Sequence, residues 1–414
     1  MRTACALALV LVACLTASPH TTADGPPLAE QYLVEGRLAE GETALVAALK
    51  ENPKDAQARF GLGTVQFLRA VERMVQSFHR FGLRPDPAGG NIPFARLPLP
   101  ENKTPKPIRY ADLRAIFEVL VDDLRKAEAT LAKVDNPVVK IPIHFGQIRL
   151  DFDGDGKASE EETLWTLYAR LNSQARVTPE AAKEFVIAFD RGDVAWLRGY
   201  CHLLMAFGEF YLAHDGKELF DRTAHLFFAR PDTPFASFGE GKAGGEGRPG
   251  IGQIADLIAV IHLLRLPVSE PKRMIAALDN LRAMLALSRE SWKFYMAEDD
   301  DDHEWIPNPK QTGVIPGVKI TEEMVKGWTI TFLDEADDLL AGRKLVPFWR
   351  GSDGRGVNLR RVFTEPREFD LVLWAQGTAA TPYLEQGELT TPEVWRRLQR
   401  IFRGEFLGFA IWFN

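Results

Sequence analysis

The residues with the most specific chemistry lie between positions 151 and 162, where acidic side chains recur at short intervals. Asp151, Asp153 and Asp155 occupy alternate positions, and Glu162 closes the stretch. Carboxylate oxygens are preferred by hard cations, and calcium takes about six to eight oxygen ligands. The stretch therefore predicts a site for a hard divalent cation.

This stretch resembles the calcium loop of the EF-hand family. In that family, oxygen ligands come from positions 1, 3, 5, 7, 9 and 12, and position 6 is a glycine, which is Gly156 here. An acidic surface loop that merely shares the spacing is the alternative, but four carboxylates together with Gly156 argue against chance agreement. The resemblance implies Ca²⁺ as the ion and assigns its ligands to Asp151, Asp153, Asp155, the Lys157 carbonyl, Ser159 (directly or through a water) and Glu162.

The surrounding sequence departs from a paired EF-hand. Position 8 is Ala158, where paired loops carry a branched apolar residue, and the sequence contains no second loop with this spacing. Apolar residues alternate over 141–152, which predicts extended backbone where the family has a helix. Ser159 and Glu162 predict a helix start after the loop. We therefore expect a solitary site in which calcium is structural, with a calcium sensor as the weaker alternative.

A second group of chemically capable residues lies on a helix predicted over residues 193–214. Arg198, His202 and Glu209 fall on one stripe of this otherwise apolar helix. They could line the pocket of an envelope hydrolase, with Arg198 binding an anion and the other two moving protons or holding a metal. We favour a buried network of ion pairs, because buried charges are normally paired. Cys201 lies off this stripe and is expected to fill the core.

Three other segments have weaker patterns, and we interpret each as structural. Residues 239–244 match the glycine spacing of a dinucleotide-binding fingerprint, but a glycine-rich sequence follows where the motif needs a helix, so we expect a loop. The acidic run 298–304 could hold a second cation, yet it lacks the spacing of the first loop, and a solvated loop is favoured. Residues 406–413 are apolar throughout, which favours a buried terminal helix over a partner-docking one.

The elements before the loop are predicted to be helical hairpins over residues 28–80, with a turn at Asn52-Pro53. This region resembles one tetratricopeptide repeat and the start of another. The resemblance implies closely paired helices and a surface that binds peptides or proteins. It rests on the small, large and proline positions Gly41, Leu45, Ala48, Pro53, Leu62 and Gly63.

Most of the remaining chain also predicts helices, and no series of strands is evident, so we expect a mainly α protein. Residues 83–109 indicate a proline-rich connector, and 236–252 and 297–318 predict glycine-rich and acidic loops. The predicted helices cover residues 110–133, 180–190, 193–214, 217–228, 251–265, 270–289, 321–341 and 391–412.

These features divide the chain into four predicted parts. A signal peptide covers residues 1–23, and a tetratricopeptide-like region with the proline-rich connector covers 25–135. An EF-hand-like segment covers 136–178, and a helical body covers 179–414.

The N-terminus predicts export. An apolar run over residues 4–15, too short to span a bilayer, follows Met1-Arg2 and precedes small residues. The cut falls after Ala23 or, because residues 11–14 resemble a bacterial lipobox, before Cys14, which would then carry a lipid anchor. Either route leads to the periplasm, the cell envelope or the medium. Cys201 is then the one cysteine of the folded body, so stability cannot depend on an internal disulfide.

Composition limits the range of partners. The chain has 414 residues, of which 46% are hydrophobic and 26% charged, and its formal net charge is −7. This balance is globular, and it argues against nucleic acid or anionic lipid as a partner, because both require a clustered positive surface. Taken whole, the chain is similar to uncharacterised exported bacterial proteins that combine the two motifs, a resemblance that implies no activity. We expect a calcium-stabilised interaction or scaffold protein with a protein or peptide partner.

Overall fold

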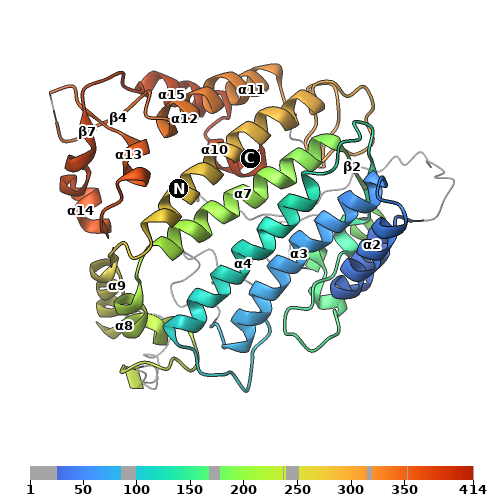
Figure 1. Ribbon diagram of the computed structural model, residues 1–414, viewed down its shortest axis with the longest axis horizontal. Coiled ribbons are helices and arrows are strands. Elements are labelled where there is room, and N and C mark those ends of the chain that lie inside the picture. The colour runs from blue at the N-terminus through green and yellow to red at the C-terminus, as the bar shows by residue number, and fades with distance from the viewer. Residues whose placement is uncertain are drawn as a thin grey trace.

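The structure is a computed structural model that describes residues 26–84, 99–166, 178–235, 237–238, 251–314, 319–351 and 353–413. The predicted signal peptide, the lipobox and the glycine motif at 239–244 lie outside these residues. The protein is mainly α-helical, as predicted (Figure 1). No helix in the described ranges is both long and apolar enough to cross a membrane.

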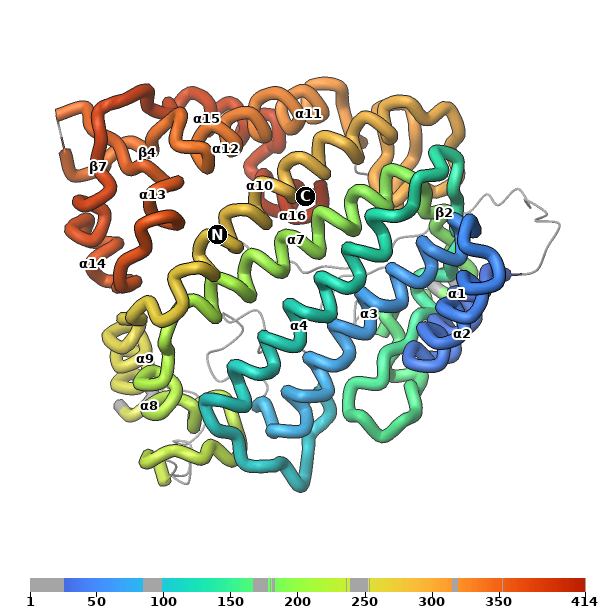
Figure 2. The backbone as a smooth tube through the Cα atoms, in the orientation of Figure 1, coloured from blue at the N-terminus to red at the C-terminus, as the bar shows by residue number. Residues whose placement is uncertain are grey.

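Four long helices lie side by side through the centre of the molecule (Figures 1 and 2). Neighbouring helices run in opposite directions: Tyr110 at the start of one contacts His214 at the end of the next, and Tyr295 at the end of the last contacts Asp193. Their apolar stripes face each other, which stabilises amphipathic helices far more than intrinsic propensity does. In order across the layer, they are α3 (Ala56–Arg80), α4 (Tyr110–Leu131), α7 (Arg191–Ala213) and α10 (Pro271–Tyr295).

The N-terminal helices α1 (Leu28–Glu35) and α2 (Leu38–Glu51) pack against α3. The predicted turn at Asn52-Pro53 is confirmed, and Asp55 caps α3 by accepting a hydrogen bond from the Ala58 N–H at 2.8 Å. The small residues have a packing reason, because a Cβ at Gly41 would overlap Tyr32 and one at Gly63 would overlap Leu131. One core cluster joins these helices to the segment before the acidic loop and to the start of α7.

The chain after α10 folds back along this helix, and the Ser288 hydroxyl of α10 donates to the Phe413 carbonyl at 3.4 Å (Figure 1). Helices α11 (Glu322–Lys326) and α12 (Leu333–Leu340) are joined by a π-helical segment over 327–332. The single helix predicted over 391–412 is wrong. The chain forms α15 (Pro392–Ile401) and α16 (Phe406–Phe413), and Arg403 and Gly404 between them have positive φ angles of 52° and 84°, which break the helix. The expectation of a buried helix over 406–413 is confirmed only in part: Phe406 and Phe413 are buried among aromatic side chains, but Leu407 is 63% exposed.

The strands are short. Antiparallel pairs join β1 (Ile141–Ile143) to β2 (Ile187–Phe189) and β3 (Arg265–Leu266) to β6 (Phe369–Asp370). The helix predicted over 180–190 is wrong in its second half, because α6 (Pro179–Glu184) ends early and residues 187–189 pair with β1 instead. The remaining elements are β4 (Val346–Pro347), β5 (Gly356–Val357), β7 (Leu384–Glu385), α8 (Lys217–Phe227), α9 (Ile251–Leu263), α13 (Leu359–Thr364), α14 (Leu371–Gln376) and short 3-10 turns over 145–147, 160–162 and 378–383.

Candidate metal centre

Residues 151–162, here called the acidic loop, lie against one face of α3. The Asp151 N–H donates to Glu72 Oε1 at 2.9 Å, and the Gln76 amide donates to the Asp151 carbonyl at 2.8 Å. One turn further on, His79 Nδ1 lies 3.0 Å from the Asp153 carbonyl oxygen. Positions 72, 76 and 79 share a face of a helix. Helix α3 therefore fixes the backbone at the start of the loop.

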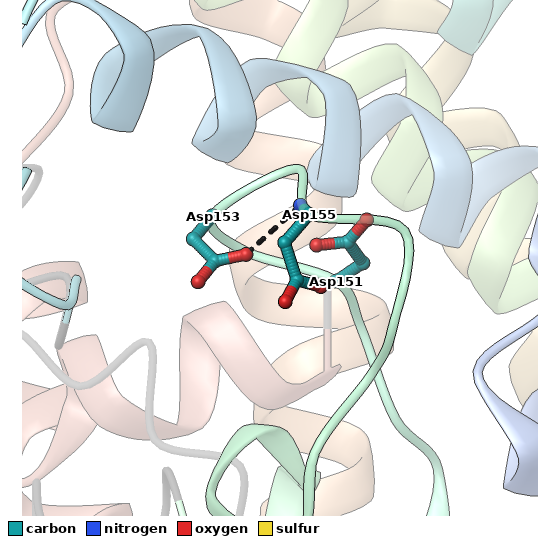
Figure 3. A group of neighbouring side chains, drawn as sticks. All are labelled: Asp151, Asp153 and Asp155. Atoms are coloured by element: carbon teal, nitrogen blue, oxygen red, sulfur yellow. Dashed lines mark hydrogen bonds between the residues drawn. The ribbon is translucent and has the colours of Figure 1, made fainter.

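Three of the predicted carboxylates converge. Asp151, Asp153 and Asp155 each place an oxygen within 4.8 Å of the others, although they lie on a single turn of irregular backbone (Figure 3). Such a distance allows one ion to contact all three. The structure thus brings together the first three ligands that the spacing predicts.

Backbone N–H groups of the loop hold these carboxylates in place. Asp151 accepts from the N–H groups of Gly154 and Gly156 at 2.7 and 3.0 Å. The Asp153 carboxylate accepts from the Asp155 N–H at 3.0 Å, and the Asp155 carboxylate accepts from the Lys157 N–H at 2.7 Å. Bonds of this kind favour the ionised form of a carboxyl group. The carboxylates are therefore oriented by the loop itself.

Two glycines allow the turn that makes these bonds. Gly154 and Gly156 have φ angles of +76° and +85°, in the left-handed region that side chains disfavour. Around Gly156 nothing lies within 4 Å of where a Cβ would be. Gly156 is therefore required for its backbone angle and not for space.

The fourth carboxylate, Glu162, joins the two ends of the loop. Its Oε1 accepts from the Phe152 N–H at 2.8 Å, and its Oε2 accepts from both the N–H and the hydroxyl of Ser159, each at 2.8 Å. Glu162 is thus hydrogen-bonded to Ser159, and neither residue belongs to the group formed by Asp151, Asp153 and Asp155. Lys157 is exposed, and its N–H donates to Asp155. Ser159 and Glu162 do begin helical backbone, but as a 3-10 turn, with α-helical residues resuming at Leu164.

The expected extended approach to the loop is confirmed in part, because a 3-10 turn over 145–147 interrupts it after β1. Ile141, Ile143, Ile148, Leu150 and Phe152 are buried on one side, and a β-bridge between Arg149 and Thr163 closes the base of the loop. The Arg149 N–H donates to the Leu33 carbonyl at 3.0 Å. The loop is thus tied to the N-terminal helices as well as to α3.

Ala158 at position 8 also has a partner in the fold. A Cβ at Gly36 would overlap the Ala158 Cβ, so the loop packs against the turn between α1 and α2. This contact occupies the place at which paired EF-hand loops would meet.

The acidic loop carries more negative than positive charge. Burial raises the pKa of Asp151, although the N–H groups of Gly154 and Gly156 oppose this shift. Burial, aided by the charge of Asp151, raises the pKa of Glu72 to about 7. Arg69 opposes the shift of Glu72, but its ion pair is with Glu42. A cation among the carboxylates would relieve this repulsion.

Sequence reasoning missed Glu72, Gln76 and His79. They lie 74 or more positions before the residues that they hold, so only the folded chain brings them together. In the sequence these three residues form a polar stripe at helical spacing, opposite the apolar face of the helix. A polar stripe of this kind usually indicates a solvent-exposed face.

Arg198 and His202 both face Glu128 of α4, with His202 Nε2 3.7 Å from Glu128 Oε1, whereas Glu209 does not join them. Arg198 forms an ion pair with Glu128 of α4 at 2.9 Å, and His202 Nδ1 lies 2.7 Å from the Asn280 side-chain oxygen of α10. Glu209 is buried and bonds to a different pair of arginines, Arg125 at 3.3 Å and Arg273 at 2.8 Å.

The favoured interpretation, a network holding core helices, fits this pairing. The charge on Arg198 that suggested an anion site is already neutralised by Glu128. Cys201 is buried, and burial raises the pKa of its thiol, which makes it a poor nucleophile.

A second acidic group, the buried carboxyl cluster of Asp190, Glu298 and Glu304, lies at the start of α7, and its oxygens fall within 4.8 Å of one another. The expectation that the run 298–304 is solvated is wrong at its last residue, because Glu304 is only 2% exposed. Burial and the neighbouring carboxyl of Asp190 raise the pKa of Glu298 to about 9, while burial and Asp302 raise that of Glu304 to about 10. Lys140 forms ion pairs with Asp300 and Asp302 in the same run.

Comparison with known proteins gives no relative: no family model, curated protein or solved structure matches the chain.

Proposed function

We propose that the acidic loop binds one Ca²⁺ ion and that the ion has a structural role in an exported interaction or scaffold protein. The observation that carries this proposal is the convergence of Asp151, Asp153 and Asp155 on oriented oxygens within 4.8 Å.

The donor set favours calcium over other common metals. Carboxylate, carbonyl and hydroxyl oxygens suit hard cations, whereas zinc prefers cysteine and histidine. Magnesium requires near-octahedral geometry and retains water, while calcium accepts an irregular ring of oxygens. The remaining ligands in the proposed EF-hand-like arrangement are the Lys157 carbonyl, Ser159 and Glu162. To bind the ion, the Glu162 carboxylate must give up its hydrogen bonds from the N–H groups of Phe152 and Ser159.

A structural role is supported by what the loop touches. Its first residues are bonded to α3, its base is bonded to Leu33, and Ala158 packs on Gly36. An ion that fixes the loop therefore stabilises the junction between α3 and the N-terminal helices. At roughly millimolar calcium, a site with a Kd of about 10⁻⁴ M would gain about 1.4 kcal/mol of folded-state stability.

A shallow groove on the same helices supports the proposal of a partner. This groove of about 220 Å³ lies among α2, α3 and α4, with Val46, Leu49 and Leu62 as its apolar part. Its basic side chains are Lys50, Arg59 and Lys133. We propose that this tetratricopeptide-like region binds a peptide that carries both apolar and acidic side chains.

Calcium titration of the mature protein tests the ion proposal. We expect saturable binding by calorimetry and a melting temperature that rises with calcium and falls with a chelator. Asp151→Ala, Asp153→Ala should abolish both effects, whereas Glu51→Ala at the exposed end of α2 should change neither. An unchanged melting temperature of the wild type on adding calcium or chelator would exclude structural calcium, and submicromolar affinity would favour the sensor alternative.

The export proposal has its own test. The chain should appear in the periplasm, the envelope or the medium of an expressing bacterium. Cys14→Ala separates the two processing routes, since it releases a lipid-anchored protein from the membrane fraction and leaves one that is cleaved after Ala23 unchanged. Retention of the wild-type chain in the cytoplasm would contradict both routes.

A further inference from the structure

A hollow of about 420 Å³ lies between the start of α11 and the end of α15, far in the sequence from the acidic loop. Three arginines, Arg397, Arg400 and Arg403, line it. Its other charged residue is Glu323. The charged side chains around the hollow therefore sum to +2, in a protein whose formal net charge is −7.

The backbone explains why these arginines gather. Arg397 and Arg400 are three residues apart on α15 and share a face of the helix. Leu398 and Phe402 on its other side are buried, which fixes the rotation of α15. Arg403 follows the helix with a φ angle of 52°, so the chain turns and keeps this side chain at the same hollow.

The charges of the three arginines are not balanced within the protein. Among the residues that the structure describes, none of the three has an ion-pair partner, although their neighbour Arg396 pairs with Glu393. Like charges held at one hollow repel each other, and a bound anion would relieve that repulsion.

The other lining groups indicate what kind of anion would fit. Thr321 accepts a hydrogen bond from the Met324 N–H at 3.2 Å, which leaves its hydroxyl proton free to donate. The side chains of Met324 and Ile401 supply an apolar part. The volume falls within the range of about 300 to 1,000 Å³ that is common for small-molecule sites.

We propose that this hollow binds a small organic phosphate, with the phosphate on the arginines and the organic group against Met324 and Ile401. Guanidinium groups donate paired N–H bonds to phosphate oxygens, and a phosphate monoester carries close to two negative charges at neutral pH, which matches the +2 of the lining. This site is independent of the calcium proposal, because none of its residues belongs to the acidic loop or contacts it.

Calorimetric titration of phenyl phosphate into the full mature protein tests the site, at fixed ionic strength set by chloride. We expect saturable binding at one site, with inorganic phosphate binding more weakly because it lacks the organic group. Arg397→Gln, Arg400→Gln should weaken binding by about tenfold or more, since each removes a charge-assisted pair of bonds. Arg396→Gln, one position away but paired with Glu393, is the matched control and should bind as the wild type does.

Two results would overturn the proposal. One is the absence of saturable binding by a wild-type protein whose melting temperature shows it to be folded. The other is an equal loss of binding in Arg396→Gln and in Arg397→Gln, Arg400→Gln, which would indicate diffuse attraction to exposed arginines. The melting temperature of each variant with and without phenyl phosphate checks that any loss reflects the site and not unfolding.

Discussion

The acidic loop and the buried carboxyl cluster both bring three carboxyl groups within 4.8 Å, yet they differ in how the negative charge is treated. In the acidic loop, backbone N–H groups donate to Asp151, Asp153 and Asp155 and favour their ionised form, although burial raises the pKa of Asp151. In the buried carboxyl cluster, burial raises the pKa of Glu298 and Glu304 well into the alkaline range, so that both hold protons at neutral pH. We propose the first arrangement as a cation site, whereas protons on Glu298 and Glu304 neutralise the second.

The difference teaches that proximity of carboxylates does not by itself define a metal centre. What matters is the free energy of the ionised state, which solvent and N–H donors favour and burial opposes. Asp190 combines both effects: it caps α7 by accepting from Gly192 at 2.7 Å, yet burial raises its pKa. A residue can therefore belong to a group of neighbouring carboxyls and still act mainly as the N-cap of a helix.

Neutralising one residue of each group should separate them most clearly. Asp151→Asn removes a charge needed for calcium and weakens two charge-assisted hydrogen bonds, so in saturating calcium it should cost about 3 kcal/mol of unfolding free energy. Glu304→Gln replaces a carboxyl that is already neutral and should cost less than about 1 kcal/mol. Urea unfolding of both variants, with calcium and with chelator, measures the two losses of unfolding free energy. Equal losses would mean that the two groups do not differ as described.

The pH dependence of stability should report the buried carboxyl cluster. Glu298 has a folded pKa of about 9 and Glu304 of about 10, against about 4.3 for glutamate in an unfolded chain. Between these values the folded protein binds more protons than the unfolded chain, so its unfolding free energy should fall as pH rises from about 5 to 9. Because Glu298 keeps some solvent contact, we expect a loss of about 2 kcal/mol between pH 6 and 9 in chelator, less than the pKa values alone would give.

Two variants check the source of that loss. Glu298→Gln, Glu304→Gln should flatten the fall in unfolding free energy. Glu42→Gln should leave it unchanged, because hydrogen bonds from Lys126 and Gln66 hold the pKa of Glu42 below its usual value despite burial, and its titration ends before this range begins. A fall of equal size in the double variant would assign the pH dependence to other groups.

The acidic loop could be predicted from the sequence and the buried carboxyl cluster could not, because the carboxyl residues within each group are separated by very different distances along the chain. Every carboxylate of the acidic loop lies within 151–162, so spacing alone indicates convergence, and the structure agrees for Asp151, Asp153 and Asp155. Asp190 and Glu298 are over one hundred positions apart and meet only because α7 and α10 pack side by side. No local pattern carries that information, and the charge run at 298–304 therefore resembled a solvated loop.

The helices show the same limit. Long periodic segments were predictable, and α4, α7 and α8 begin and end within about two residues of the expected positions. The predictions were wrong where a distant strand partner or a single backbone angle determines the secondary structure. Residues 187–189 became a strand because β1 offers hydrogen bonds, and the left-handed angle at Arg403 split the last predicted helix. The short helices α13 and α14 were missed because six residues give too little periodicity to detect.

The backbone of the acidic loop can be tested apart from its charges. Gly156→Ala should cost about 1 to 2 kcal/mol, because its φ angle of +85° is disfavoured for any residue with a Cβ. Gly408→Ala is the matched control: it also has open space around the added Cβ, but it lies in α16, where alanine is favoured over glycine by about 0.5 to 1 kcal/mol. Thermal unfolding of the two variants should therefore shift in opposite directions. A stabilised Gly156→Ala would contradict the left-handed turn.

The smallest expected effect comes from the contact between α3 and the acidic loop. Gln76→Ala removes a donor to the Asp151 carbonyl and should cost about 1 kcal/mol, together with a severalfold loss of calcium affinity as the loop loosens. Gln57→Ala is matched to it, because Gln57 also lies on α3 and donates to a backbone carbonyl, that of Lys140, at the same distance of 2.8 Å. Only the first variant should change calcium binding by calorimetry. If both leave calcium affinity unchanged, the loop holds its carboxylates without help from α3, and the sequence of residues 151–162 alone determines the site.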